Sequence, residues 1–559
     1  MRVGWQSFLL TDQIREQLTA EKLDVRVVRR ILERLRSDKE GMEFPLALQL
    51  RHSFQRFLDF HEFVNDAQAS EKTSVAIEET HKRIADYRVN PTPTDGAEIG
   101  RQIGLLRRRH QAPKLVESVD QGFNQSNLFI QASKKLVATG IEQDIDETSP
   151  LNDSVLGVRI AGTVRMTGRV SLAMLPNEEN ASLKLLLHGQ ANSSNVGWKG
   201  PVTVHSTGYT AITAEKLLTI DSSGLHGSPA SAACATSSSI DGVDANCGLI
   251  QRLATKKAHK SKGQAEAVAS SKAESRVESR VDEQAAEMLD KANDSFQKKF
   301  RKPLVRRDGF PRSLRIRSTE DRLLVDWLQR SDAQIAASSP APPMSGQQDL
   351  EVRLHQSFVT NFSEAAIGGV TLTDEKLAQM LEDATGEVPE ELRIDEDKDP
   401  WSITFSTSSP ISATFADQTI TLAIHGDRFT RSDTKLNTPM RITAIYRFEK
   451  TPTGSKLVRQ GEVEVVYSSQ KPGQRESTQQ VAFKTFMRRK FDALFKSEIV
   501  SEGIKLPGRW EKGGKLQVRD MTTTREWLSA SWDMTPIPES EKKSETVDKT
   551  AARLAPAAP

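Results

Sequence analysis

One layout of helix, corner and strand pair occurs twice in this chain, and it constrains the fold more than any other feature. In the middle of the chain, FQKKFRKPL leads into GFPRSLRIRSTEDRLLVDW, which ends at Trp327. Much later, MRRKFDALF leads into KLPGRWEKGGKLQVRDMTTTREWLSASW, which contains Trp527. Each copy predicts a helix in which a phenylalanine follows basic residues, and then an apolar residue directly followed by proline. A short strand, a polar turn and a tryptophan-containing strand complete the layout.

Other features recur in the same order, and this favours internal duplication over a chance likeness of two α+β domains. Each half begins with a strand that turns into a helix, and each has a later strand that ends in a Leu/Ile-His-Gly corner. The matched positions are His188-Gly189 with His425-Gly426, Phe300 with Phe491, Phe310-Pro311 with Leu506-Pro507, and Trp327 with Trp527.

The distribution of apolar residues divides the chain into five parts. Helical periodicity amid many charges is followed by period-two alternation typical of strands, and a Pro, Ser and Gly cluster marks a linker. A long, charge-rich helix with a sparse apolar stripe ends the first α+β part. We therefore expect an all-helical N-terminal region at 1–110, a first α+β repeat at 123–335, a linker at 336–348, a second α+β repeat at 349–534 and a disordered tail at 535–559.

The order of elements over 123–534 resembles the tubular lipid-binding superfamily, which includes bactericidal/permeability-increasing protein. The resemblance rests on element order alone, because the superfamily has no signature motif. It implies an α+β fold of two tandem domains, each a curved antiparallel sheet wrapped on a long helix. Two features depart from the family: the first-repeat helix is unusually charged, and the N-terminal helical region has no counterpart there.

The resemblance also implies a function, namely non-catalytic binding of a lipid or another long apolar ligand in a groove between helix and curved sheet. Phe300 and Phe491 are the residues that we expect to line that groove, because each is a large apolar side chain on a basic helix just before the corner. The alternative is a structural or protein-interaction module whose cores are filled by their own side chains. Such a module would use the N-terminal helices and the charged helix for protein partners.

Motifs that would indicate an enzyme or a metal site were not found, so we expect no catalytic residues, no cofactor and no metal. Asp395, Asp397 and Asp399 have calcium-loop spacing, but Pro400 stands where the loop needs Gly and Ser406 where it needs Glu. His188 and His425 are isolated strand-end histidines. Cys234 and Cys247 either form one disulfide or are two ordinary thiols.

Composition limits the partners and the compartment. A formal net charge of +2 on 559 residues gives no reason to expect nucleic acid. No apolar run is long enough to span a bilayer, so we expect no transmembrane segment. The N-terminus has no signal-peptide pattern. Taken literally, this predicts a cytoplasmic protein, whereas a start truncated in the given sequence would allow a periplasmic one.

Overall fold

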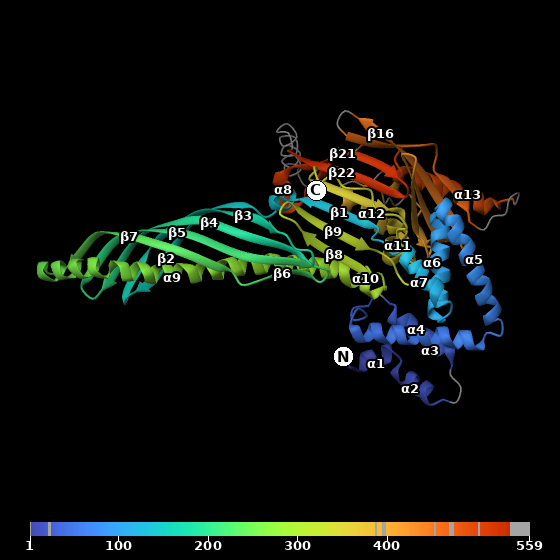
Figure 1. The fold of residues 1–559 in the computed structure, drawn as a ribbon, viewed down its shortest axis with the longest axis horizontal. Coiled ribbons are helices and arrows are strands. Elements are labelled where there is room, and N and C mark those ends of the chain that lie inside the picture. Colours follow the sequence, from blue (N-terminus) through green and yellow to red (C-terminus); the bar gives the residue numbers. More distant parts are fainter. Residues whose placement is uncertain are drawn as a thin grey trace, which may run out of the picture.

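The structure, a computed structural model of the chain, describes residues 2–20, 24–37, 39–385, 388, 390–393, 399–451, 454–468, 475–500 and 503–536. Within these residues, helices at the N-terminal end precede three antiparallel sheets, and one long helix runs along a rod that projects from a thicker body (Figure 1). The predicted fold class is confirmed: the chain is α+β, with two curved antiparallel half-barrel sheets after an N-terminal helical region.

The N-terminal region is helical, and helix formation continues past residue 110. The described helices here are α1 (Arg2–Phe8), α2 (Thr11–Thr19), α3 (Val25–Leu35), α4 (Pro45–Asn65), α5 (Ala69–Val89), α6 (Pro93–Arg108) and α7 (Pro113–Gly122). Three of them begin with proline, at a position that needs no N–H donor. Helices α5 to α7 form a core around Ile99, Ile103 and Leu106, and Ile335 from far along the chain completes it.

A seven-stranded central sheet joins the two halves of the chain. Its strands, in spatial order, are β20 (Ile504–Lys505), β21 (Lys515–Thr524), β22 (Trp527–Thr535), β10 (Leu350–His355), β1 (Leu128–Ser133), β9 (Arg322–Leu328) and β8 (Ser313–Ser318). The first strands of the two halves, β1 and β10, pair in the centre. The closing hairpin of each half, β8–β9 or β21–β22, lies beside its own first strand, so the two repeats share one sheet.

The two halves are related by an approximate two-fold axis through the pair of Ile130 and Val352. The antiparallel register of β1 and β10 is the same on either side of this pair. Each strand then leads into a short helix, α8 (Lys134–Thr139) or α11 (Gln356–Ile367). The backbone hydrogen bonds around the axis also match: Ser133 N donates to Asp349 O at 2.8 Å, and His355 N donates to Asn127 O at 2.9 Å.

Side chains follow the same symmetry, because Asn127 and Asp349 hold equivalent places. Gln329 N donates to Asn127 Oδ1 at 2.8 Å, and Met534 N donates to Asp349 Oδ2 at 2.9 Å. Across the axis, Asn127 Nδ2 donates to Ser357 Oγ at 3.0 Å, and Lys135 Nζ donates to Asp349 Oδ2 at 3.0 Å. Each half therefore anchors the helix of the other, as an internal duplication predicts.

The register corrects the predicted alignment of the tryptophans. Trp327 pairs with Leu128, whereas Leu350, the counterpart of Leu128, pairs with Trp532. Trp532 rather than Trp527 is therefore the counterpart of Trp327. Two tryptophans lie in β22, and the alternation that reveals a strand does not fix its register. The apolar-Pro corners also differ, since a 3-10 helix, η3 (Gly508–Gly513), separates Pro507 from β21 while Pro311 lies just before β8.

The rod is the half-barrel sheet of the first repeat with one long helix along it (Figure 1). Its strands are β2 (Gln143–Val155), β3 (Val158–Leu175), β4 (Ala181–Lys199), β5 (Val202–Asp221), β6 (Gly224–Gly227) and β7 (Ser231–Ala245). Helix α9 (Gly248–Ser295) has 48 residues, which at 1.5 Å per residue gives a length of about 70 Å. It continues through a π-helix, η1 (Phe296–Arg301), into α10 (Lys302–Arg306).

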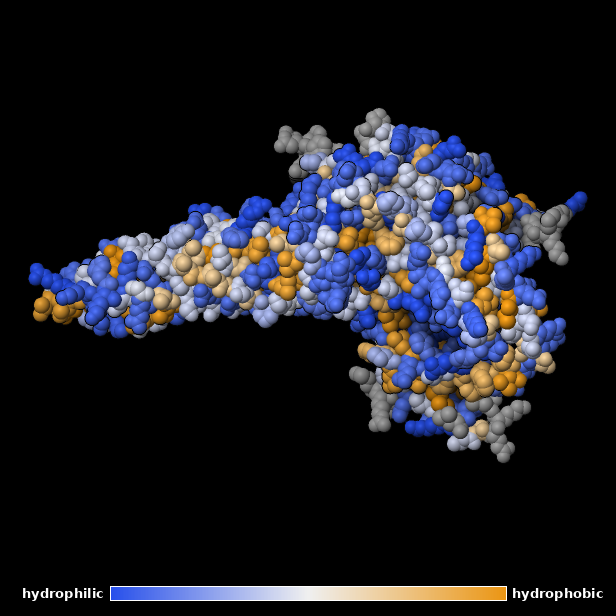
Figure 2. Space-filling view, viewed as in Figure 1, coloured by the Kyte–Doolittle hydropathy of each residue, from blue (hydrophilic) through white to orange (hydrophobic). Residues whose placement is uncertain are grey.

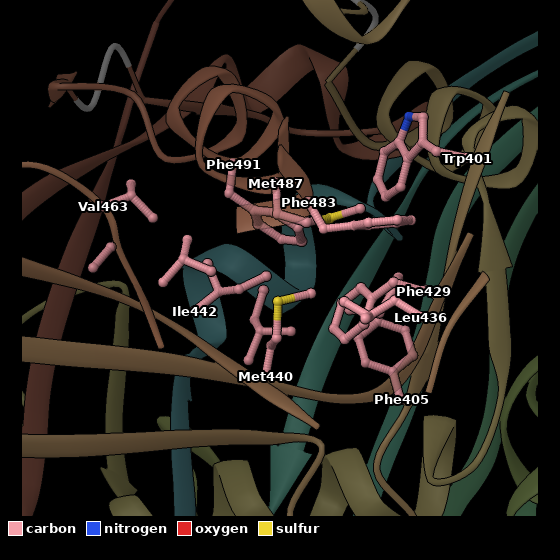
Figure 3. Packing of buried hydrophobic residues seen from close by; sticks show 14 of the residues in the cluster. Trp401, Phe405, Phe429, Leu436, Met440, Ile442, Val463, Phe483, Met487 and Phe491 are labelled. Carbon is pink, nitrogen blue, oxygen red and sulfur yellow. The ribbon is translucent and has the colours of Figure 1, made fainter. Parts of the chain in front are cut away.

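The second half-barrel sheet encloses the largest described apolar core. Its strands are β11 (Thr371–Thr373), β12 (Trp401–Phe405), β13 (Ile411–Ala416), β14 (Thr419–Arg431), β15 (Thr434–Leu436), β16 (Met440–Thr451), β17 (Gly454–Arg459), β18 (Glu464–Tyr467) and β19 (Glu498–Val500). Its helices are α12 (Asp374–Thr385), η2 (Glu390–Leu392) and α13 (Thr478–Leu494). Helix α13 places Phe483, Met487 and Phe491 against the sheet (Figure 3).

The predicted domain boundaries stay a prediction. In the expected linker, Ala336 and Ala337 are buried and Ala337 bridges to Gln125, while exposed positions begin at Pro340. In the expected tail, strand β22 ends at Thr535, and residues 537–559 lie outside the described part of the chain.

Candidate functional site

Three stripes of side chains, each repeating every four residues, fix α9 to the rod. Residues four apart lie on nearly one face of a helix, so each stripe meets one structure. The apolar stripe is Ala265, Ala269, Ala273, Val277, Val281, Ala285 and Leu289; the acceptor stripe is Glu266, Ser270, Glu274, Glu278 and Asp282; the basic stripe is Lys272, Arg276 and Arg280.

The acceptor stripe covers the edge strand β7. Backbone N–H groups of alternate residues donate to successive members: Ala230 to Asp282 (2.9 Å), Ala232 to Glu278 (3.1 Å), Cys234 to Glu274 (3.1 Å), Thr236 to Ser270 (2.9 Å) and Ser238 to Glu266 (2.6 Å). Two strand residues advance about 6.8 Å and four helical residues about 6 Å, so the two repeats stay nearly in step. The stripe therefore satisfies an edge that would otherwise pair with another strand.

The basic stripe holds the opposite edge, strand β2. Lys272 Nζ and Arg276 Nη2 lie 2.5 and 2.6 Å from the two oxygens of Asp153. Arg280 lies 3.8 Å from Glu147. Helix α9 thus connects both edges and closes the half-barrel along its length.

The space between α9 and the sheet, where the sequence predicted a ligand groove, contains the protein's own side chains. Val277 and Val281 pack against Leu187, Ile212 and Ala214. On strands β4, β5 and β7, every second residue lies on the same face as Leu187, Ile212 and Ala214. Toward the free end of the rod, the residues on this face are small or polar; they include Ser193, Asn195, Gly208, Thr210 and Thr236. An acyl chain in this distal part would contact hydroxyl and amide groups.

Phe300 lies where α9 reaches the central sheet, in an aromatic cluster of half-buried rings. The cluster consists of Phe296, Phe300, Phe310, Trp327, Phe358 and Phe362. The ring centroid of Phe300 is 5.4 Å from that of Phe296 and 5.2 Å from that of Trp327. The π-helix turn that carries Phe300 comes just before Pro303, whose ring displaces the carbonyl one turn earlier.

Phe491 has a different environment. It is 4% exposed in the core of the second half-barrel, with its ring centroid 6.4 Å from that of Trp401 on β12 (Figure 3). It therefore packs on the second half-barrel rather than on the closing strands β21 and β22. The structure does not bring Phe300 and Phe491 together, and their role in ligand binding stays a prediction.

The free end of the rod carries exposed apolar side chains that sequence reasoning missed. Leu249 and Leu253 in the first turns of α9 are 69% and 64% exposed, and Ile250, Trp198 and Leu156 are also exposed beside them. The turn between β2 and β3, the turn between β4 and β5 and the start of α9 meet here, because Trp198 pairs with Arg159 and Val202 with Ala245. Figure 2 shows a hydrophobic patch at this end. We call these five residues the apolar tip.

Basic residues follow the apolar tip along the same helix. Residues 246–265 contain five Lys or Arg and no Asp or Glu. Among them, Arg252, Lys256, Lys257 and Lys260 are exposed, and Lys199 lies on the neighbouring turn with its Nζ 2.9 Å from Leu156 O. This arrangement, apolar at the end and basic one turn behind, was readable in the sequence as GLIQRLATKKAHKSK.

The structure leaves the other candidate residues apart. Cys234 on β7 and Cys247 before α9 are free thiols, and burial followed by Glu274 and Glu278 raises the pKa of Cys234. The predicted strand ends at His188 and His425 are wrong, because β4 continues to Lys199 and β14 to Arg431. His188 is exposed, and burial lowers the pKa of His425. Asp399 forms an ion pair with Arg431, while Asp395 and Asp397 lie outside the described residues. In the part of the chain that the structure describes, no group of three or more His, Cys, Asp or Glu could hold a metal ion.

Comparisons with known proteins found only remote structural similarity. No family model matches the chain, and no curated protein matches its sequence. Among solved structures, a lipopolysaccharide binding protein is similar at 13% identity and a TM-score of 0.29, covering 74% of this chain and 100% of that one. P47 of Clostridium botulinum E1 is similar at 7% identity and a TM-score of 0.20, with the same coverage. Scores this low carry no information about function.

No helix among the described residues is both long enough and apolar enough to cross a membrane.

Proposed function

We propose that this protein binds lipid without catalysing a reaction, and that the apolar tip of its rod contacts an anionic membrane surface. The observation that carries the proposal is the pairing of exposed Leu249 and Leu253 with exposed Lys256, Lys257 and Lys260 on one helix. End-on contact would place the leucines at the acyl boundary and the lysines among the headgroups. Long basic side chains reach headgroups while their stems cover apolar surface.

The energies involved are large enough for reversible binding. Full removal of a Leu or Ile side chain from water is worth about 1.5–3 kcal/mol. Each Lys or Arg near an anionic lipid surface adds about 1 kcal/mol, a contribution that salt screens. Two or three apolar residues and three or four basic ones therefore supply binding that depends on both lipid charge and ionic strength.

The aromatic cluster around Phe300 is the place on this chain that we propose for an acyl chain. Its rings are half-buried, so they already form an apolar surface that is not sealed by other side chains. An acyl chain gains about 0.8 kcal/mol for each CH₂ removed from water. We prefer this site to the predicted groove under α9, where Val277 and Val281 pack against the sheet. It keeps the function that the resemblance to the tubular lipid-binding superfamily implies.

Co-sedimentation with vesicles tests the membrane contact. The full chain should bind vesicles that contain phosphatidylglycerol more strongly than vesicles of phosphatidylcholine alone, and salt should weaken the difference. Leu249→Ser combined with Leu253→Ser should weaken binding to both vesicle types by about tenfold or more. Lys256→Gln combined with Lys260→Gln should cost about 2 kcal/mol, and only on the anionic vesicles.

The matched control is Leu46→Ser, which removes an equally exposed leucine (68%) from α4, far from the tip. It should leave vesicle binding unchanged. Equal binding by the parent chain and the double leucine variant would show that the tip is not the membrane contact.

A second candidate function is the structural or protein-interaction module with filled cores. The observation that favours it is the closed packing around Phe491, together with exposed Phe57, Phe60 and Val64 along one side of α4. Mass spectrometry of an organic extract of the purified protein separates the two. A stoichiometric lipid supports the acyl site, and a clean extract together with absent vesicle binding supports the interaction module.

A further inference from the structure

A cavity of about 190 Å³ lies between the N-terminal helices and the second repeat. Tyr87 of α5, Gly96 of α6 and residues of helix α11 line it. Ser409, in the loop before β13, also lines the cavity. The cavity has room for several waters or one small molecule.

Helix α11 turns a polar row toward this cavity. Gln356, Thr360 and Glu364 follow one another at intervals of one turn, and all three line the cavity. Gln356 is 2% exposed and Thr360 is 6% exposed. Buried polar groups of this kind normally have hydrogen-bond partners, because leaving one unpaired is costly.

Three of the lining oxygens have no hydrogen-bond partner among the described residues: Gln356 Oε1, Thr360 Oγ1 and Ser409 Oγ. The orientation of the Gln356 amide is fixed by its nitrogen, which donates to Glu526 Oε1 at 3.0 Å. Its oxygen therefore points away from Glu526 and is free to accept a hydrogen bond from a molecule in the cavity. The cavity is thus lined by one amide oxygen and two hydroxyls without partners among the described residues, and all three can accept a hydrogen bond.

The pseudo-two-fold axis shows that the fold does not require this hollow. Because α8 begins at Lys134 and α11 begins at Gln356, the counterparts of Gln356 and Thr360 on α8 are Lys134 and Ala138. Ala138 is buried in an apolar cluster with Leu172 and Met174. The same position is therefore a buried alanine in an apolar cluster in the first half, whereas in the second half it is Thr360, whose hydroxyl has no hydrogen-bond partner among the described residues.

The charges around the cavity favour a positive ligand. The Glu364 carboxylate accepts from Ser409 N at 3.1 Å, and Glu526 lies behind Gln356. Arg101 lines the cavity, but its guanidinium is 2.5 Å from Glu98. Burial raises the pKa of Glu364, and a cation beside it would favour the ionised form.

We propose that this cavity binds a small organic cation with several N–H groups, of the alkylguanidinium or alkyldiamine class. Its N–H groups would donate to Gln356 Oε1, Thr360 Oγ1 and the Glu364 carboxylate. A cation of this kind supplies both the missing donors and the opposite charge, which a neutral molecule or a row of waters supplies only in part.

Isothermal titration calorimetry on the full chain tests this proposal, with agmatine and putrescine as probes and glycerol as a neutral comparison. We expect agmatine or putrescine to bind at one site per chain and glycerol not to bind. Thr360→Val keeps the shape of the side chain and removes the hydroxyl, and it should weaken binding by about tenfold. Glu364→Gln should weaken binding by at least as much.

The control is Thr443→Val on β16, which removes another buried hydroxyl without a partner, far from the cavity. It should bind the probes as the parent does. Absence of binding by both cations would mean that the cavity holds water only and would overturn the proposal. So would unchanged affinity in Glu364→Gln, which would place the probes elsewhere on the surface, or equal binding of glycerol.

Discussion

At the residue scale, the tryptophans show how the two repeats interlock. Trp327, from the first repeat, places its ring centroid 5.3 Å from that of Phe358 on α11 of the second. Its counterpart Trp532, from the second repeat, packs with Leu136 on α8 of the first. Each closing strand therefore covers the helix of the other half. Trp527, the residue that the sequence matched with Trp327, instead packs on Phe129 and His355.

These environments predict an order of stability for tryptophan-to-alanine variants. Trp527 is 1% exposed and its Nε1 donates to Ser339 Oγ at 3.1 Å, so Trp527→Ala should lower the free energy of unfolding by about 3–5 kcal/mol. Trp327 is half-buried, so Trp327→Ala should cost less, about 1–3 kcal/mol. Trp198→Ala at the exposed tip should change it by no more than about 0.5 kcal/mol. Urea denaturation measures all three, and a cost at Trp327 equal to that at Trp527 would contradict this order.

At the element scale, the sequence predicted where helices and strands lie better than it predicted which strands pair with one another. Alternation and turn residues predicted most strands of both repeats, and helical periodicity predicted the N-terminal helices. They did not predict β2, which is polar along most of its length, or the small-residue second half of β7. The pairing of β1 with β10 was out of reach, because the strands are separated by more than 200 residues and neither carries a local signal for the other. A strand pattern also leaves the register open, which is why Trp527 was matched in place of Trp532.

Helix α9 was readable in part. Its sparse apolar stripe was visible, and glutamates interleaved with basic residues on a helix are typical of ion pairs along the helix surface. In the structure, Glu274 and Glu278 instead accept backbone N–H groups of β7. The four-residue period of the acceptors could have been found in the sequence, but an unpaired strand edge as their partner is a property of the assembled sheet.

This ladder predicts the behaviour of an α9 variant. Glu274→Ala combined with Glu278→Ala leaves two N–H groups of the edge strand without acceptors, and we expect a loss of stability of roughly 1–2 kcal/mol for each bond. Hydrogen exchange should accelerate at Ala232 and Cys234, and self-association through β7 should increase. Ser275→Ala combined with Ser279→Ala alters the exposed side of the same turns and serves as the control. Unchanged exchange at Ala232 and Cys234 would show that the helix does not protect this edge.

At the scale of the whole molecule, the central sheet makes the two repeats one structural body. The β1–β10 pairing, the crossed hydrogen bonds of Asn127 and Asp349 and the packing of Trp327 on α11 all connect residues on opposite sides of the predicted linker. The rod, by contrast, extends away from this body and keeps its tip free for contact (Figure 1). The fold thus separates an interlocked base from a long projecting arm.

Cutting the chain in the predicted linker distinguishes an interlocked body from two independent domains. A protease site introduced after Pro343, an exposed position, would give fragments 1–343 and 344–559. Because the pairing of β1 with β10 does not depend on chain continuity, the cut protein should elute as one species in gel filtration and separate only in denaturant. Asp349→Ala removes the acceptor of Lys135 Nζ and of Ser133 Oγ, which lie in the other fragment, so its fragments should separate at a lower urea concentration. Asp349→Asn reproduces the residue that the other half has at this place and should behave more like the parent. Fragments that separate in buffer while keeping their circular dichroism would mean that each repeat folds alone and that 336–348 is a linker between independent domains.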